Sequence, residues 1–100
     1  MRSRRFQVTK GLAFDTCKKA LRTFDCEITS SDINVGEIEA KKGGNFLSFG
    51  HKLKVTIKET KGNGLRISVF SNSVGPQVID WGTNSDNEEK LLKIITAALA

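Results

Sequence analysis

The sequence predicts an α+β domain with two layers, in which a curved antiparallel sheet packs against a long C-terminal helix in the order β-α-β-β-β-β-α. Three observations predict this class. Apolar and polar residues alternate over 52–58, as in a strand with one buried face. Apolar residues over 14–24 and over 91–99 follow helical spacing. Short turns between successive strands imply antiparallel pairing with helices on one face.

The first strand is predicted over residues 5–9, where Phe6 and Val8 share one face. Residues 1–4 are expected to fray, and Gly11 is expected to end the strand. A helix is then predicted over residues 12–24, because its apolar residues recur at intervals of three and four.

The next segment contains two candidate strands, and the apolar alternation changes its parity within the second one. Residues 26–29 are predicted as a strand, followed by turn residues at 30–32. From Ile33 to Ala40 the apolar positions change from odd to even numbers. A β-bulge at Gly36 would return both sets to the core face, because one extra residue reverses the alternation.

Strands over residues 51–60 and 65–70 form the most clearly predicted hairpin. The apolar residues of both strands stand at odd positions, so an odd number of loop residues is needed to place them on one face. We therefore predict a three-residue loop, 62–64, with one glycine in the left-handed conformation. This loop sets Ile57 opposite Val69.

The closing helix is predicted from an S-x-x-E pattern, Ser85 and Glu88, which is typical of a capping box at a helix N-terminus. The broad apolar stripe that follows predicts a helix buried on one side. The stripe consists of Leu91, Leu92, Ile94, Ile95, Ala98 and Leu99.

Length and composition limit the class of protein. One hundred residues predict a single domain over 1–100. The net charge of +5 is concentrated in the first ten residues and in 51–66. No apolar run approaches the roughly 20 residues of a membrane span. The N-terminal arginines are followed by no apolar export segment, so we expect a cytoplasmic protein.

Few residues suggest catalysis or metal binding. Cys17 and Cys26 are expected to be reduced thiols, at least one of them buried, with a single bridge as the alternative. His51 is the only histidine, and no pattern specifies a nucleophile or an acid beside it. The oxygen-rich run over 80–89 does not match the EF-hand spacing. We therefore expect a protein that is not an enzyme and has no metal and no cofactor.

The element order resembles the β-α-β4-α unit of the TATA-binding-protein-like fold, and it also resembles a reduced helix-grip domain of the START/Bet v1 kind. Both resemblances rest on the helix over 14–24, the strands ending at Phe70 and the closing helix after Asp80-Trp81-Gly82. The segment over 80–87 also resembles a stretch found in small uncharacterised bacterial proteins of this shape. These resemblances imply a fold and no particular activity.

The first functional hypothesis concerns apolar residues near two loops. Phe46, Leu47 and Phe49 lie in or beside a glycine-bearing loop, and Trp81 precedes the last helix. These side chains either close the core or line a pocket mouth or a dimer contact. The hypothesis is a non-enzymatic module that holds a small apolar ligand or pairs with a second copy of itself as a homo-oligomer.

The alternative hypothesis is binding of nucleic acid or an anionic surface by the outward face of the 51–70 hairpin. The N-terminal arginines, Lys41 and Lys42 could extend this face, and the predicted loop sets Lys58 opposite Ser68. Phe70 is the one outward aromatic residue, and lysines facing water also prevent sheet aggregation, so nucleic acid ranks second. The basic candidates are Lys52, Lys54, Lys58, Lys61 and Arg66.

Overall fold

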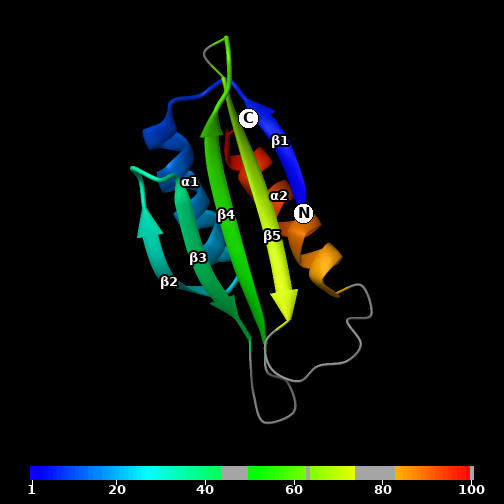
Figure 1. Cartoon of the computed structure of the whole chain (residues 1–100). Coiled ribbons are helices and arrows are strands. Elements are labelled where there is room, and N and C mark those ends of the chain that lie inside the picture. Colours follow the sequence, from blue (N-terminus) through cyan, green and yellow to red (C-terminus); the bar gives the residue numbers. More distant parts are fainter. Residues whose placement is uncertain (44–49, 63, 74–82, 100) are drawn as a thin grey trace.

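The computed structural model describes residues 1–43, 50–62, 64–73 and 83–99. They form one five-stranded antiparallel sheet and two helices, and Figure 1 shows their arrangement. The predicted α+β class and the element order are confirmed. The elements are β1 (Arg2–Phe6), α1 (Lys10–Thr23), β2 (Cys26–Asp32), β3 (Glu37–Lys42), β4 (His51–Glu59), β5 (Leu65–Ser73) and α2 (Thr83–Leu99).

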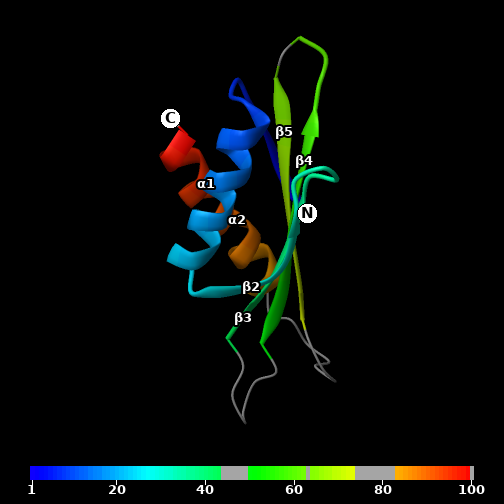
Figure 2. The ribbon, with the colours of Figure 1, turned by 90° about the vertical axis from the view of Figure 1, so that its left-hand side faces the viewer.

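The sheet has the strand order β1-β5-β4-β3-β2, so β1 and β2 are its edge strands. Helix α1 connects these two edges along the chain. Both helices lie on the same side of the sheet, and no described helix covers the opposite side (Figure 2). Helix α1 contacts β2, β4 and α2, whereas α2 contacts β5 and β1. Among the described residues, no helix combines the length and apolar character that crossing a bilayer requires.

The core lies between the helices and the inner face of the sheet. The alternating apolar residues of β4 and β5 are buried there, as predicted, because their odd positions all point toward the helices. Residues from α1, α2 and β3 complete this layer. Its fully buried larger side chains are Leu21, Ile38, Leu53, Ile57, Leu65, Ile67, Leu91, Ile95, Val55, Val69 and Cys17.

Strand β1 begins earlier than the sequence predicted. Residues 2–6 pair with β5, from Arg2 opposite Val69 to Phe6 opposite Leu65. Backbone pairing with β5 places Arg2 to Arg4 in the sheet, although the strand was predicted to start at residue 5. Their charged side chains gave no strand pattern that sequence periodicity could detect.

Helix α1 agrees with the predicted helix to within two residues at its N-terminus. Thr9 is the N-cap, and its side chain accepts a hydrogen bond from the Leu12 amide at 3.3 Å. Gly11 lies inside the helix and does not end the preceding strand. The predicted strand over 5–9 was wrong at its C-terminal end. Strand β1 ends at Phe6, and Thr9 already caps the helix that starts at Lys10.

The β2–β3 connection corrects two predictions. Residues 30–32 belong to β2, and the turn follows over 33–36. Gly36 closes this turn with a φ of 79°, but the register shift lies in β2 between Ile28 and Ser30. The bulge is therefore at Thr29. Ile33, which the sequence analysis placed on the core face, is exposed in the turn.

The β4–β5 hairpin has the predicted parity but a different centre. Ile57 lies opposite Ile67, and Glu59 lies opposite Leu65. The Thr60 amide donates to the Gly64 carbonyl at 2.9 Å, so three residues of the sequence separate these backbone partners. Gly62 has a φ of 85°, which confirms the left-handed glycine. The predicted odd length of the loop and its left-handed glycine are therefore confirmed. The predicted pairing of Ile57 with Val69 was wrong.

Helix α2 begins two residues before the predicted N-cap. Since Thr83 starts the helix, Ser85 lies within its first turn and the predicted capping box does not form. Glu88, its proposed acidic partner, is buried against β5. The S-x-x-E pattern correctly located a helix N-terminus but gave Glu88 the wrong role.

Candidate functional site

The sheet side opposite the helices, which we call the outer face, carries most of the basic candidates. Directly paired residues of an antiparallel sheet point to the same side, so the register arranges side chains in rows across the strands. Lys58 on β4 pairs with Arg66 on β5, and Arg66 pairs with Arg5 on β1. We call Arg5, Arg66 and Lys58 the cation row. This pairing replaces the predicted pairing of Lys58 with Ser68.

A second basic group lies toward the other end of the same face. Lys41 on β3 pairs with Lys52 on β4, and Lys52 pairs with Asn72 on β5. Both lysines are exposed. Lys52 and Lys58 are six residues apart on one strand, which corresponds to about 20 Å along β4. The outer face therefore has two basic groups at opposite ends of its central strands.

The acidic residues of the outer face lie on β2 and β3. Glu39 pairs across the strands with Lys54, and Glu37 forms an ion pair with Lys54 at 3.4 Å. Over the described stretches, Lys52, Lys58 and Arg66 take part in no ion pair. Most of the basic candidates thus keep their charge available to an external anion.

A groove on the outer face contains the second basic group, Lys41 and Lys52, and extends from it toward Phe70. Its volume is about 440 Å³, and the exposed ring of Phe70 forms part of its wall. Phe70 lies opposite Lys54 in the sheet, so an aromatic surface and an ammonium group adjoin on the same face. Polar and charged side chains supply most of the remaining lining. The groove is lined by Thr29, Glu39, Ala40, Lys41, Lys52, Leu53, Lys54, Phe70 and Asn72.

Two other basic candidates lie elsewhere. Lys61 is exposed in the β4–β5 loop, beyond the end of β4. Lys42 pairs with His51 and points to the inner side, where its Nζ lies 4.5 Å from the centre of the Phe24 ring. Lys42 therefore does not extend the outer face. The apolar candidates Phe46, Leu47, Phe49 and Trp81 lie outside the described residues.

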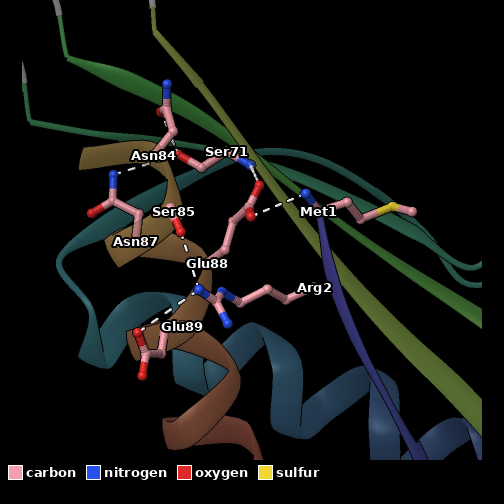
Figure 3. Close-up of polar contacts among 8 residues, drawn as sticks. All are labelled: Met1, Arg2, Ser71, Asn84, Ser85, Asn87, Glu88 and Glu89. Carbon is pink, nitrogen blue, oxygen red and sulfur yellow. Dashed lines mark hydrogen bonds and ion pairs between the residues drawn. The ribbon is translucent and has the colours of Figure 1, made fainter. Parts of the chain in front are cut away.

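A buried polar cluster joins α2 to the end of β5, and Figure 3 shows its members. Glu88 Oε2 accepts a hydrogen bond from the Ser71 amide at 2.9 Å, and Glu88 Oε1 lies 3.1 Å from the Met1 ammonium. Beside this cluster, Arg2 lies 3.1 Å from Ser85 Oγ and 3.9 Å from a Glu89 oxygen. These contacts connect the first strand, β5 and the last helix.

The hydroxyl group of Ser71 lies among amide groups. It donates to Asn84 Oδ1 at 2.8 Å and lies 3.4 Å from Asn87 Nδ2. His51 Nδ1 lies 2.9 Å from the same Asn84 oxygen. An amide cannot take up a proton as a general base, so this arrangement does not activate Ser71 as a nucleophile. The cluster fits a structural role.

Both cysteines are unbridged and buried, as predicted. Burial raises the pKa of the Cys17 thiol to about 12 and that of Cys26 to about 11. Such thiols remain protonated at neutral pH and are poor nucleophiles. Within the residues that the structure describes, no three His, Cys, Asp or Glu side chains form a set that could bind a metal ion.

Sequence reasoning missed Asn72 and Glu39 as parts of the groove. Asn72 has the same parity as Phe70, so its outward position could be found from the alternation. Glu39 required the β3–β4 register, which no sequence pattern specified. The buried cluster around Glu88 was also missed, because its S-x-x-E context fits an exposed capping residue equally well.

Comparisons with known proteins give no further assignment. No family model matches the chain, and no curated protein matches it in sequence.

Proposed function

We propose that this protein is a non-enzymatic module that binds single-stranded nucleic acid along the outer face of its sheet. One observation carries the proposal: the exposed Phe70 ring lies between two basic groups on the same face. A single strand offers regularly spaced phosphates and unpaired bases, and proteins bind it with a basic path plus aromatic stacking surfaces.

The cation row is an argument for an anionic partner, because its like charges repel each other in the unbound protein. Like charges directly opposite each other in a sheet are destabilising, by roughly 0.2–1 kcal/mol for each pair. Arg5, Arg66 and Lys58 place three such charges on adjacent strands. A phosphate bound among them would offset this repulsion.

Phe70 favours a single strand over a duplex or a membrane surface. Bases inside a duplex are stacked on each other, so their ring faces are not available to a protein side chain. In a single strand, stacking of one base on an aromatic side chain contributes about 1–3 kcal/mol. Lipid headgroups would satisfy the lysines but offer no ring for Phe70.

The apolar-ligand and self-association hypothesis receives less support. The space between the helices and the sheet is filled by buried side chains of the core. The four apolar candidates are outside the described residues, so that hypothesis stays an untested prediction. The β-α-β4-α resemblances to the TATA-binding-protein-like and helix-grip folds remain proposals as well. Neither supports nucleic-acid binding, because a shared fold does not carry a shared function.

Fluorescence anisotropy with labelled single-stranded oligonucleotides tests the proposal. If about five cations contact phosphates, the logarithm of the binding constant should fall with the logarithm of salt concentration with a slope of roughly −3 to −4. The triple variant K52E/K54E/K58E should lose measurable binding. Lys19→Glu, on the exposed side of α1, is the matched control for charge and should bind as the parent does.

The single variant Lys58→Glu separates binding from stability. A glutamate opposite Arg66 replaces a repulsive pair with an attractive one, so the free energy of unfolding should rise by about 0.5 kcal/mol. Binding should weaken at the same time. Binding of anionic vesicles with no binding of oligonucleotides would contradict the proposal, and so would unchanged oligonucleotide binding in the triple variant.

A further inference from the structure

We infer that the groove beside Phe70 is a base-selective pocket, which takes one nucleotide base with an exocyclic amino group and rejects uracil and thymine. This inference rests on the proposed function and adds sequence preference to it. Uracil and thymine are the bases without an exocyclic amino group. Selection therefore requires hydrogen-bond acceptors close to a stacking surface.

The size and lining of the groove suit a single base. Its volume of about 440 Å³ falls in the range of roughly 300–1,000 Å³ that is typical of small-molecule sites. Phe70 is the aromatic residue in its lining, so one base can stack there. The lining also contains Lys41, Lys52 and Lys54, and in this proposal Lys41 and Lys52 contact the phosphates on either side of that base.

Asn72 supplies the first acceptor. It lies two residues beyond Phe70 on β5, so both side chains point to the outer face. Its amide makes no hydrogen bond within the described part of the chain, although it is exposed in the groove. A side-chain amide beside a stacked base can accept from an amino group and donate to the neighbouring ring nitrogen.

Glu39 supplies the second acceptor, from the other side of the groove. It lies in one cross-strand row with Lys54 and Phe70. Its Oε2 atom accepts from Ser30 Oγ at 3.4 Å, and no described contact occupies Oε1. A carboxylate on a nucleic-acid-binding face repels phosphates and so weakens binding, unless it accepts a hydrogen bond from a donor group of a base. Acidic side chains in nucleic-acid interfaces do accept from the cytosine amino group.

Cytosine and uracil are the sharpest pair of probes. Both are single-ring bases, so they stack similarly on Phe70, but cytosine has an amino group where uracil has a carbonyl oxygen. The carbonyl would face the carboxylate of Glu39, and it could not donate to it. Asn72 can rotate its amide to pair with either base, so Glu39 carries the selection. A selective contact of this kind corresponds to roughly ten-fold in affinity.

The test compares ten-nucleotide oligocytidine and oligouridine by fluorescence anisotropy at one salt concentration. We expect cytidine to bind roughly ten-fold more tightly. Glu39→Ala should reduce the ratio of the two affinities, whereas Asn72→Ala should weaken both probes and change the ratio little. Glu39→Ala should also strengthen binding of oligouridine, because it removes a negative charge that uridine does not contact favourably. Phe70→Leu should weaken both probes and leave their ratio close to that of the parent protein.

Glu27→Ala provides the matched control. Glu27 pairs with Lys41 on the outer face but does not line the groove, so its loss should leave the ratio unchanged. Equal binding of the two probes, or an unchanged ratio in Glu39→Ala, would overturn the pocket and leave the proposed function standing. Failure of the parent protein to bind either probe at low salt would overturn both.

Discussion

Glu88 is a buried carboxylate on α2, and its two oxygens explain how the fold tolerates it. One accepts from the Ser71 amide at 2.9 Å, and the other lies 3.1 Å from the Met1 ammonium. A buried charge without such partners would cost several kcal/mol. The Ser71 amide depends on Glu88 in return, because no other described acceptor serves it. This one side chain therefore attaches α2 to the end of β5 (Figure 3).

Replacement of Glu88 by alanine should lower the free energy of unfolding by about 2–3 kcal/mol. The substitution leaves the Ser71 amide buried without an acceptor, and hydrogen bonds to charged groups are worth about 1.5–3 kcal/mol. Glu88→Gln keeps an acceptor oxygen and should cost less than the alanine variant. Urea unfolding followed by circular dichroism measures the difference.

The adjacent residue provides the control. Glu89 is about half exposed and forms an ion pair with Lys93 at 3.3 Å. Exposed pairs of this kind contribute between zero and about 1 kcal/mol, so Glu89→Ala should change stability by roughly 0.5 kcal/mol. If Glu88→Ala and Glu89→Ala had equal effects, the structural role of Glu88 would be wrong.

At the scale of the elements, the β2–β3 turn requires a glycine at position 36, whereas helix α1 does not require one at position 11. Gly36 ends the β2–β3 turn with a φ of 79°, and a β-carbon there would collide with the Ile57 carbonyl oxygen. Its own carbonyl accepts from the Ile57 amide at 2.7 Å, so the backbones approach closely. Gly11 lies in α1, and a β-carbon there would meet no atom within 4 Å.

Alanine should therefore have opposite effects at these positions. Gly36→Ala should lower stability by more than about 2 kcal/mol, because it combines a strained φ with a backbone clash. Gly11→Ala should raise stability by about 0.5 kcal/mol, since alanine is the better helix former. Thermal and urea unfolding of the two variants checks both signs. A tolerated Gly36→Ala would mean that the turn can adopt another conformation.

The sequence predicted the elements better than their connections. Strand parity required an odd β4–β5 loop, and the structure agrees. Parity could not locate the loop centre, because Gly62 and Gly64 both fit a left-handed position. Gly64 instead packs closely, since a β-carbon there would lie 2.8 Å from Gln7 Nε2. That contact comes from a distant part of the chain and has no local signal.

The β2–β3 turn was misplaced for a similar reason. Asp32 Oδ1 accepts from the Asn34 amide at 2.9 Å and from the Val35 amide at 3.4 Å, so Asp32 starts the turn rather than ends it. The apolar Ile33 and Val35 are consequently exposed, although their alternation resembles that of a strand. Local hydrogen bonding by one side chain outweighed the apolar pattern.

The outward position of the basic residues of β4 and of Phe70 was predictable from the sequence, whereas Glu39, Asn72 and the arrangement across the strands were not. Alternation alone placed Lys52, Lys54, Lys58 and Phe70 on the outward side, and the structure has them there. Which residues lie opposite each other across β4 and β5 depends on the register of the two strands. The predicted register was shifted, because the centre of the loop was predicted one residue too late. Arg5 belongs to the cation row only because β1 pairs with β5. These are the first and the last of the described strands along the chain, so no local sequence pattern predicts that they are neighbours.

At the scale of the whole molecule, the buried thiols make stability depend on alkaline pH. Burial raises the pKa of Cys17 from 9.0 to about 12. Between these values the unfolded chain loses a proton that the folded protein keeps. Stability is therefore fully present below pH 9.0 and falls as pH rises toward about 12.

Cys17→Ala should flatten this dependence. Each titrating thiol contributes a slope of up to about 1.4 kcal/mol per pH unit, so the variant should lose less stability than the parent between about pH 9 and about pH 11. Cys26, whose pKa is raised to about 11, continues to contribute in the variant. Urea unfolding at several pH values measures both slopes. Parallel slopes for the two proteins would show that Cys17 ionises equally in both states.

The distribution of charge on the outer face has a kinetic consequence. Its acidic residues lie on β2 and β3, whereas the outward positions of β1, β5 and β4 carry cations and no carboxylate. The field of this face is therefore asymmetric across the strands and extends about one Debye length, or roughly 8–10 Å, into physiological solution. A polyanion approaching by diffusion would be turned toward the β1–β5–β4 side before any contact forms. Such steering accelerates productive encounters and shortens the search for the correct orientation.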